Sequence, residues 1–184
     1  MKKNTPYRTL SSQIVWSCPW YNVRQDQIVT PDGRLGVYNV VQKEDAVWIV
    51  PVTPDHKIIL IYNYRHTVQD WCWEVPAGSQ EPHHTTIEET ARAELQEEVG
   101  GVANKLEYVS SFYVASGIFN EIGHIFLATG VRLGQAARES TEVMEVHCLP
   151  VAQVLQMVRT GQIRDGNSAL ALLLCEPKLQ AWLK

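Results

Sequence analysis

The sequence predicts a layered α/β/α fold that is preceded by an N-terminal arm of β-strands. Two nearly continuous apolar runs, Ala46–Val52 and Lys57–Tyr64, surround the turn Thr53–Asp55. Strands this apolar are usually buried on both faces, which requires helices above and below the sheet. Segments with helical periodicity also alternate with strand-like segments along the chain, as expected for a layered fold.

The chain length and composition fit a globular protein. The 184 residues are 45% hydrophobic and 20% charged, which suffices for one domain with a substantial core. There are 16 Lys and Arg against 20 Asp and Glu, a net charge of −4. This mild acidity disfavours nucleic-acid binding, which needs a basic face, but it is compatible with carboxylates that hold metal cations.

The sequence also indicates a cytoplasmic protein. No apolar stretch follows the charged N-terminus, so we expect no signal peptide. The apolar run Ala169–Cys175 is too short to span a bilayer, so we expect no membrane segment. The cysteines show no paired spacing and are expected to be reduced thiols: Cys18, Cys72, Cys148 and Cys175.

The N-terminal arm is predicted to comprise residues 1–45, and residues 46–184 are predicted to form the main domain. Within the arm, Gln13–Trp16, Gln27–Thr30 and Leu35–Gln42 have the composition of strands. Pro31–Gly33 is typical of a turn, because proline presets φ and glycine accepts a positive φ. An arm of this length is too short to form a hydrophobic core of its own.

The main domain continues with three more strands and three helices. A first helix is expected from Ile87 to about Val99, with Thr85 or Thr86 as its N-cap and Gly100 and Gly101 as its stop. Further strands are expected at Leu106–Val114, His124–Thr129 and Val143–Leu149. A second helix is expected at Val151–Arg159, and a last helix is expected to begin at Asn167 or Ser168.

The first helix carries an unusual set of carboxylates. Glu94, Glu97 and Glu98 share one face, and no Lys or Arg lies three or four residues from any of them. They also lie near the C-terminal end of the helix, where the helix dipole disfavours negative charge. Three such carboxylates would suit a hard cation such as Mg²⁺ or Mn²⁺. A solvated acidic face is an equally good explanation from spacing alone.

The surrounding sequence resembles the signature of the Nudix hydrolases, G-x5-E-x7-R-E-U-x-E-E-x-G-U, in which U is apolar. Glu94–Gly100 matches its second half, although Gly101 replaces the last apolar residue. Ala93 stands at the position of the signature arginine, whose role in the family is to help hold the carboxylates. Gly78 lies one residue too far upstream, so the first signature glutamate falls on Thr85 or His84.

The resemblance covers nearly the whole chain from about residue 12. Within the family, the sequence is most similar to the ADP-ribose pyrophosphatases. The segments that follow their order are Asp32–Arg34 with Val37–Tyr38, Asp45–Val47, Tyr64–Arg65, Glu74–Gly78, Ala115–Glu121 and Gly161–Ala169. The resemblance implies a Nudix-type α/β/α sandwich with a mixed sheet. It also implies a homodimer in which the N-terminal strands help to build the partner's site.

Together with the carboxylate pattern, the resemblance indicates roles for individual residues. Glu94 and Glu98 are expected to be the primary metal ligands, and the Ala77 carbonyl is a further expected ligand. Glu97 is expected either to share the metal or to lie just behind its ligands, and both Glu97 and Glu98 are expected to be catalytic. Glu121 is expected to be the general base or an extra ligand in a mobile loop beside Gly117, with Glu142 and Glu145 as competitors. Arg65 is expected to bind the phosphates of the substrate, because a guanidinium can bind a phosphate in bidentate fashion. A cation at the edge of a strand explains Arg65 equally well.

The expected activity is therefore Mg²⁺-dependent hydrolysis of the diphosphate bond of a nucleoside diphosphate sugar. The most similar branch predicts ADP-ribose as the substrate, with AMP and ribose 5-phosphate as products. One alternative is a binding module that retains nucleotide affinity but hydrolyses poorly, since Ala93 and the irregular loop depart from the signature. Another is a hydrolase for a different substrate, such as GDP-mannose or a dinucleotide.

Overall fold

The computed structural model describes residues 5–136 and 143–182. Its chain forms two compact units. The N-terminal unit combines the segment up to Glu44 with Tyr113–Ile122, and the second unit combines Asp45–Phe112 with the chain from Gly123 onward. A loop that lies far along the chain therefore belongs to the same unit as the N-terminal strands.

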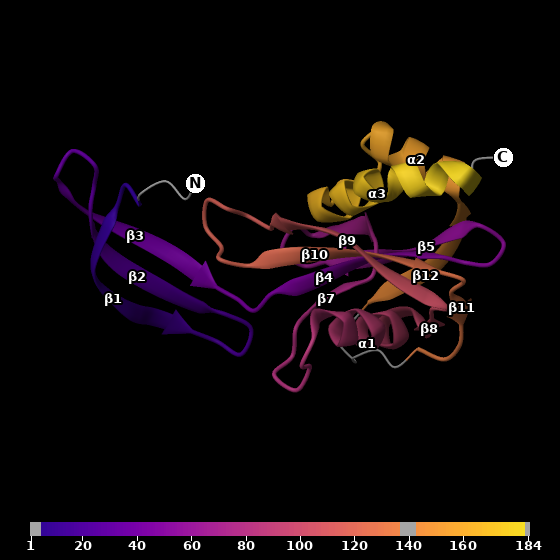
Figure 1. Ribbon diagram of the computed structural model, residues 1–184, viewed down its shortest axis with the longest axis horizontal. Coiled ribbons are helices and arrows are strands. Elements are labelled where there is room, and N and C mark those ends of the chain that lie inside the picture. Colours follow the sequence, from indigo (N-terminus) through magenta and orange to yellow (C-terminus); the bar gives the residue numbers. More distant parts are fainter. Residues whose placement is uncertain (1–4, 137–142, 183–184) are drawn as a thin grey trace. The chain divides into compact units, whose positions relative to one another are not determined.

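The N-terminal unit is built on a three-stranded antiparallel sheet in the order β1-β2-β3 (Figure 1). The strands are β1 (Arg8–Ser17), β2 (Asn22–Val29) and β3 (Leu35–Gln42). The prediction for β3 is confirmed. Strand β1 extends beyond its predicted range at both ends, and β2 begins five residues earlier than predicted and ends at Val29, because backbone pairing continues through polar residues that carry no strand signal. Gly33 has φ +84° in the turn between β2 and β3, as its turn chemistry predicted.

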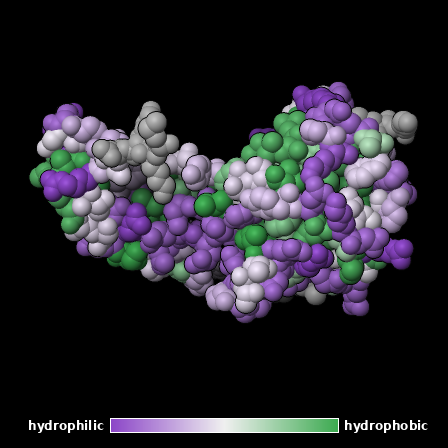
Figure 2. Space-filling view, in the orientation of Figure 1, coloured by the Kyte–Doolittle hydropathy of each residue, from purple (hydrophilic) through white to green (hydrophobic). Residues whose placement is uncertain are grey.

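Hydrophobic side chains lie at the surface of this small sheet, where Figure 2 shows them among hydrophilic ones at the left of the view. Every residue of β1 is exposed. The large exposed hydrophobic residues of the three strands and the β1–β2 turn are Leu10, Ile14, Val15, Trp16, Trp20, Tyr21, Leu35, Val37 and Tyr38. The sheet buries Ile28 of β2 but leaves most of its large apolar side chains exposed within the described chain.

The second unit contains a mixed sheet in the order β12-β5-β4-β10-β9. Its strands are β4 (Ala46–Val52), β5 (Lys57–Arg65), β9 (Lys105–Tyr113), β10 (Ile122–Thr129) and β12 (Met144–Pro150). Strand β4 pairs in parallel with β10, while β5 pairs antiparallel with β4 and β12. Two short strands join the sheet, β6 (Asp70–Glu74) beside β5 and β7 (Ala77–Ser79) beside β4. The predicted fold class is confirmed.

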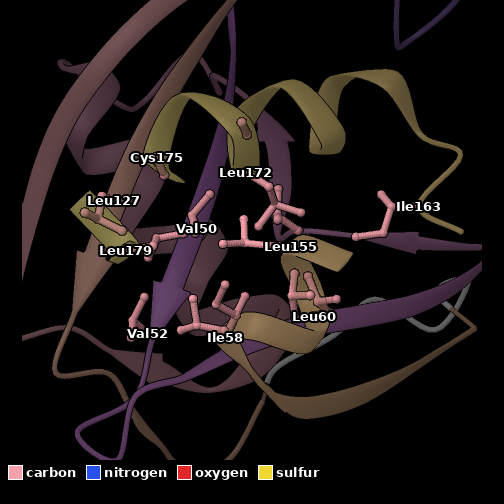
Figure 3. Packing of buried hydrophobic residues seen from close by; sticks show 14 of the residues in the cluster. Val50, Val52, Ile58, Leu60, Leu127, Leu155, Ile163, Leu172, Cys175 and Leu179 are labelled. Atoms are coloured by element: carbon pink, nitrogen blue, oxygen red, sulfur yellow. The ribbon is translucent and has the colours of Figure 1, made fainter. Parts of the chain in front are cut away.

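Helices cover both faces of this sheet, with α1 (Ile87–Val99) on one and α2 (Val151–Arg159) and α3 (Gly166–Leu179) on the other (Figure 1). Strand alternation separates the two cores. Ile58 and Leu60 pack with α2 and α3 (Figure 3), whereas Ile59 and Ile61 pack with α1. Burial on both faces confirms what the apolar runs predicted.

The remaining elements are small. Strands β8 (Gly101–Val102) and β11 (Arg132–Leu133) form a separate pair, and η1 (Gln180–Trp182) follows α3. The ranges predicted for the first and second helices are confirmed. None of the helices in the described chain is both long and apolar enough to cross a membrane.

The prediction for the N-cap of the last helix is wrong. Helix α3 begins at Gly166, and the side chain of Asp165 caps it by accepting from the backbone N–H of Ser168. Ser168 lies inside the first turn, where its hydroxyl accepts from the backbone N–H of Val75 at 3.1 Å. Asp165 and Ser168 both have side chains that can cap a helix, but the Ser168 hydroxyl is bound to the backbone N–H of Val75, which follows β6.

Candidate active site

The site is organised by α1, whose N-terminus is firmly capped. The Thr86 hydroxyl accepts from the backbone N–H of Glu89, and the Glu89 carboxylate accepts in return from the backbone N–H of Thr86. A capping residue of this kind stabilises a helix by about 1 kcal/mol. At the other end, Gly100 adopts a left-handed conformation with φ +67°. The capped helix packs Ala91, Leu95 and Val99 into the core, which fixes the direction of the adjacent carboxylate face.

Glu94 lies directly against Gly78. A methyl group placed on Gly78 would meet Oε1 of Glu94 at 1.9 Å, closer than any real contact of a Cβ atom. Gly78 belongs to β7, which pairs with β4, so its backbone is held in place. The absence of a side chain at Gly78 therefore makes the space that the Glu94 carboxylate fills.

Glu98 lies against the preceding residue of the same strand. Its Oε2 accepts a hydrogen bond from the backbone N–H of Ala77 at 2.9 Å, and the side chain is buried, with 5% of the residue exposed. Consecutive residues of β7 thus contact two carboxylates that are one helical turn apart. Glu97, between them on the helix, is exposed. The structure brings Glu94, Glu98 and Ala77 together and places Glu97 toward solvent.

The carboxylates do not form a closed cage. Within residues 5–136 and 143–182, no three His, Cys, Asp or Glu side chains lie close enough to hold a metal ion together. The donors present are nevertheless those that a hard cation prefers, since carboxylate and carbonyl oxygens bind Mg²⁺ and Mn²⁺. The oxygen donors of Glu94 and Glu98, which contact adjacent residues of β7, fit such an ion, and the Ala77 carbonyl would be a further donor.

Arg65, at the end of β5, is bound to a carboxylate that the sequence did not single out. Its Nε and Nη2 donate to the carboxylate of Glu74 at 2.6–3.1 Å. Glu74 is buried, with 5% of the residue exposed, and Nδ2 of Asn63 donates to it at 3.5 Å. These hydrogen bonds to Glu74 raise the pKa of Arg65, and the negative charges of Glu98 and Asp165 raise it further.

The segment Glu74–Ala77 is held by four different elements. Glu74 binds Arg65 on β5, and the Val75 N–H donates to Ser168 on α3. The Pro76 carbonyl accepts from the backbone N–H of Ile49 on β4, and the Ala77 N–H donates to Glu98 on α1. With each residue tied to a separate element, the backbone that meets the carboxylates has little freedom to move.

Comparison with known proteins assigns the chain to a family. The model of the NUDIX domain matches residues 42–169, which is more than half of the chain. The chain belongs to the Nudix family. A second model, the nucleoside diphosphate sugar hydrolase N-terminal domain, matches residues 7–41. The chain is a Nudix pyrophosphohydrolase whose substrate class is nucleoside diphosphate sugars, and enzymes of this family generally depend on a divalent metal ion.

Individual relatives support this assignment. The chain is 32% identical over 173 residues to an ADP-ribose pyrophosphatase of Mycobacterium tuberculosis, covering 91% of this chain and 82% of the relative. It is 28% identical over 172 residues to an ADP-ribose pyrophosphatase of Bacillus subtilis, covering 92% of each. The crystal structure of an ADP compounds hydrolase aligns with a TM-score of 0.83 over 98% of each chain, at 22% identity. This last similarity concerns the fold.

The departure from the Nudix signature at Ala93 is not repaired by the neighbouring arginine. Arg92 donates to Glu88, one turn earlier, and both side chains are about half exposed. Arg92 thus forms an ordinary surface ion pair, worth at most about 0.5 kcal/mol. The first signature glutamate has no carboxylate counterpart either, because its place falls on His84 or Thr85. Their side chains contact Thr90 and Glu89.

Glu121 and Gly117 lie in the N-terminal unit. Glu121 is buried, with 2% of the residue exposed, and its Oε1 is 3.0 Å from Nζ of Lys43. The carbonyl of Gly117 accepts from the Tyr38 hydroxyl at 3.4 Å. Backbone hydrogen bonds also tie Ile118 and Asn120 to Val41, so this loop is attached to the end of β3. Glu121 is therefore a paired, buried carboxylate within its own unit.

Glu142 and Glu145 are the two alternatives to Glu121 as the general base. Glu145 alternates on β12 with Met144 and Val146, which pack on the α1 side of the sheet. Its side chain lies on the opposite face, where it contacts His147 at 3.1 Å. Glu145 thus faces away from the α1 carboxylates. Glu142 lies outside the described residues.

Two residues of this site were missed by sequence reasoning, Glu74 and Ser168. Glu74 directly precedes Val75–Gly78, so a carboxylate next to that segment was the available signal. Ser168 was considered only as a helix cap. The contact of Ser168 with Val75 spans 93 positions, and that of Glu74 with Arg65 depends on the pairing of β5 with β6, so local patterns reveal neither.

Proposed function

We propose that this protein hydrolyses ADP-ribose to AMP and ribose 5-phosphate with Mg²⁺, for which Mn²⁺ can substitute. The observation that supports the proposal is that Glu94 lies against Gly78 and Glu98 against Ala77, so two carboxylates of α1 contact adjacent residues of β7. The names of the relatives from two bacteria support the choice of ADP-ribose, since each match spans more than 90% of this chain.

The proposed reaction adds water to one phosphorus atom and breaks the bond between that phosphorus and the bridging oxygen. Glu94, Glu98 and the Ala77 carbonyl would hold the divalent ion, with Glu97 as a further carboxylate from the exposed side. When bound, such an ion neutralises phosphate charge and lowers the pKa of a bound water. Arg65 would bind a phosphate oxygen with the part of its guanidinium that Glu74 does not occupy.

Glu121 is proposed to take the proton from the attacking water. In the described structure it is paired with Lys43, so it must part from that ammonium group before it can act as a base. Gly117, where a Cβ would meet nothing within 4 Å, would let the loop backbone approach the substrate. Comparing the turnover rates of Glu121→Gln and Lys43→Gln separates loss of the base from loss of the ion pair, because both variants break the pair but only Glu121→Gln removes a base.

A substrate panel tests the proposed activity. ADP-ribose, GDP-mannose and a dinucleotide are each incubated with and without Mg²⁺, and the products are separated by chromatography. AMP and ribose 5-phosphate should form from ADP-ribose only when Mg²⁺ is present. Faster turnover of GDP-mannose or the dinucleotide would support hydrolase activity but show that ADP-ribose is not the preferred substrate. Failure to turn over any of the three would refute the proposal.

We also propose that the active form is a homodimer. The exposed hydrophobic side chains of β1 to β3 would be covered by a second copy of the chain, because a monomer rarely leaves so many together in water. Light scattering coupled to size exclusion should give twice the monomer mass of 20.8 kDa. A monomer mass at micromolar concentration would contradict this.

The second candidate function is nucleotide-sugar binding with weak hydrolysis. Ala93 favours it, because Arg92 is occupied by Glu88 and does not fill the place of the signature arginine. Calorimetry that detected tight ADP-ribose binding, in an enzyme with negligible turnover, would support this function. Under this alternative Ala93→Arg should raise the turnover rate, whereas a fully active parent enzyme excludes it.

A further inference from the structure

Glu74 is a buried carboxylate to which the reaction proposed above gives no role. It is the last residue of β6, and its backbone pairs with Ile61 of β5. Ile61 packs on the α1 side of the sheet together with Leu95 of α1. Glu74 therefore occupies the end of a strand near the helix that carries Glu94 and Glu98, three residues before Ala77.

The contact between Glu74 and Arg65 restricts the arginine strongly. Two nitrogens of the guanidinium, Nε and Nη2, donate to the two carboxylate oxygens, so the plane of the group is set. The carboxylate is itself held, because it is buried and also accepts from Asn63. The third nitrogen, Nη1, is not part of this contact, and 48% of the Arg65 side chain is exposed. Arg65 is thus fixed along one edge and accessible along another.

The Arg65 guanidinium lies on the α1 side of the sheet. Along β5 its side chain alternates in phase with Ile59 and Ile61, which pack against α1. The pKa of Arg65 is raised first by its hydrogen bonds to Glu74 and, to a smaller extent, by the charge of Glu98. Helix α1 has no Lys or Arg three or four residues from Glu94, Glu97 or Glu98. A cation on the α1 side of the sheet is therefore supplied by β5, and Glu74 orients it.

We propose that Glu74 is a positioning residue that fixes the Arg65 guanidinium on the α1 side of the sheet, so that the diphosphate of a substrate meets a cation of set orientation. This proposal rests on the proposed function, because it takes the α1 carboxylates as the place where the diphosphate binds. Glu74 itself touches no reacting atom. It acts through Arg65, whose side chain would otherwise sample many rotamers in contact with solvent.

A double-mutant cycle with a metal-free readout tests this. The variants are Glu74→Gln, Arg65→Lys and the combination, and calorimetry measures the binding of ADP without metal. Glu74→Gln keeps the size of the side chain but removes its charge, and Arg65→Lys keeps the charge but removes the bidentate geometry. Each single variant should weaken ADP binding about tenfold. The double variant should be no weaker than Arg65→Lys alone, because Glu74 acts only through Arg65.

Glu88→Gln is the matched control. It removes a carboxylate from another Arg–Glu contact, that with Arg92 at 2.8 Å on the exposed side of α1, and should leave ADP binding unchanged. Thermal unfolding of each variant monitors the fold. If Glu74→Gln does not fold, Arg65→Lys alone carries the test, since ADP binding as tight as in the parent would show that the orientation is immaterial.

Several results would overturn the proposal. These are unchanged ADP binding in Glu74→Gln, additive losses in the double variant, or a parent protein that binds no ADP without metal. The metal-free readout also separates this proposal from the proposed function. If no substrate in the panel is hydrolysed but Glu74→Gln still weakens ADP binding, the positioning role stands and the assigned hydrolysis fails. With an active parent, KM should rise more than kcat falls in Glu74→Gln, because an interaction with the bound diphosphate is lost.

Discussion

The backbone N–H of Ala77 donates to Oε2 of Glu98 across 2.9 Å, and this hydrogen bond joins β7 to the last turn of α1. A buried carboxylate must find hydrogen-bond donors, and here a backbone amide supplies one. The residue that donates the N–H also carries the carbonyl proposed as a metal ligand. The contact therefore sets the distance between two of the proposed ligands.

Glu98→Gln should lower kcat by at least about a hundredfold while the fold is kept. The amide oxygen of glutamine can still accept from Ala77, but the negative charge that would bind a divalent ion is gone. Initial rates at increasing Mg²⁺ and thermal unfolding without metal check both parts. Glu88→Gln on the exposed face of the same helix is the control and should keep the parent rate. A Glu98→Gln variant as active as the parent would remove Glu98 from the metal site.

Gly78→Ala should weaken metal binding without unfolding the protein. The new methyl group would lie 1.9 Å from Oε1 of Glu94, so the flexible end of the glutamate must move away. Calorimetry with Mn²⁺ should show a raised Kd. Gly166→Ala is a suitable control, because a Cβ at Gly166 meets nothing within 4 Å. Equal Mn²⁺ affinity in Gly78→Ala and the parent would contradict the placement of Glu94 as a ligand.

Ser168→Ala should destabilise the protein by about 1–3 kcal/mol, since the buried backbone N–H of Val75 would lose its acceptor. Unfolding in urea measures this loss. Ser110→Ala serves for comparison, because the Ser110 hydroxyl makes only a 3.4 Å hydrogen bond to the neighbouring carbonyl, and its free energy of unfolding should change little. Equal stability of Ser168→Ala and the parent would show that Val75 finds another acceptor.

Cys175 should make the stability of the protein fall at alkaline pH. Burial of its thiol raises the pKa from 9.0 to about 12, because the interior disfavours the thiolate. The thiol is neutral in both states below pH 9, so it has no effect there. Between pH 9 and 12 only the unfolded chain ionises, so the free energy of unfolding should fall by about 1.4 kcal/mol per pH unit.

Urea unfolding of the parent and of Cys175→Ala at pH 8 and pH 10.5 measures this effect. Other groups also titrate in this range, but they are common to both proteins. The stability advantage of the parent over Cys175→Ala should therefore shrink at pH 10.5. An advantage that is independent of pH would mean that the Cys175 thiol ionises in the folded protein as readily as in the unfolded chain.

Local sequence patterns determined most of the secondary structure. The apolar runs predicted β4 and all but the last residue of β5, and helical periodicity with a Thr cap and a Gly stop predicted the range of α1. These signals are strong because they depend only on residues that are close in the sequence. The period of a helix or strand decides which of those residues share a face. The carboxylates of α1 stood out for the same reason. The prediction for the N-cap of α3 was wrong because the Ser168 hydroxyl binds the backbone N–H of Val75, which is 93 positions away in the sequence.

The sequence by itself determined the layered fold, the range of α1 and the carboxylates that this helix carries. Only the tertiary structure decided which of them meet the strand: Glu94 lies against Gly78 and Glu98 against Ala77, while Glu97 faces solvent. It also paired Arg65 with Glu74, two residues nine positions apart whose contact exists because β5 and β6 are hydrogen-bonded neighbours. Such contacts depend on how strands and helices pack, and packing is set by the whole core and not by any local run of residues.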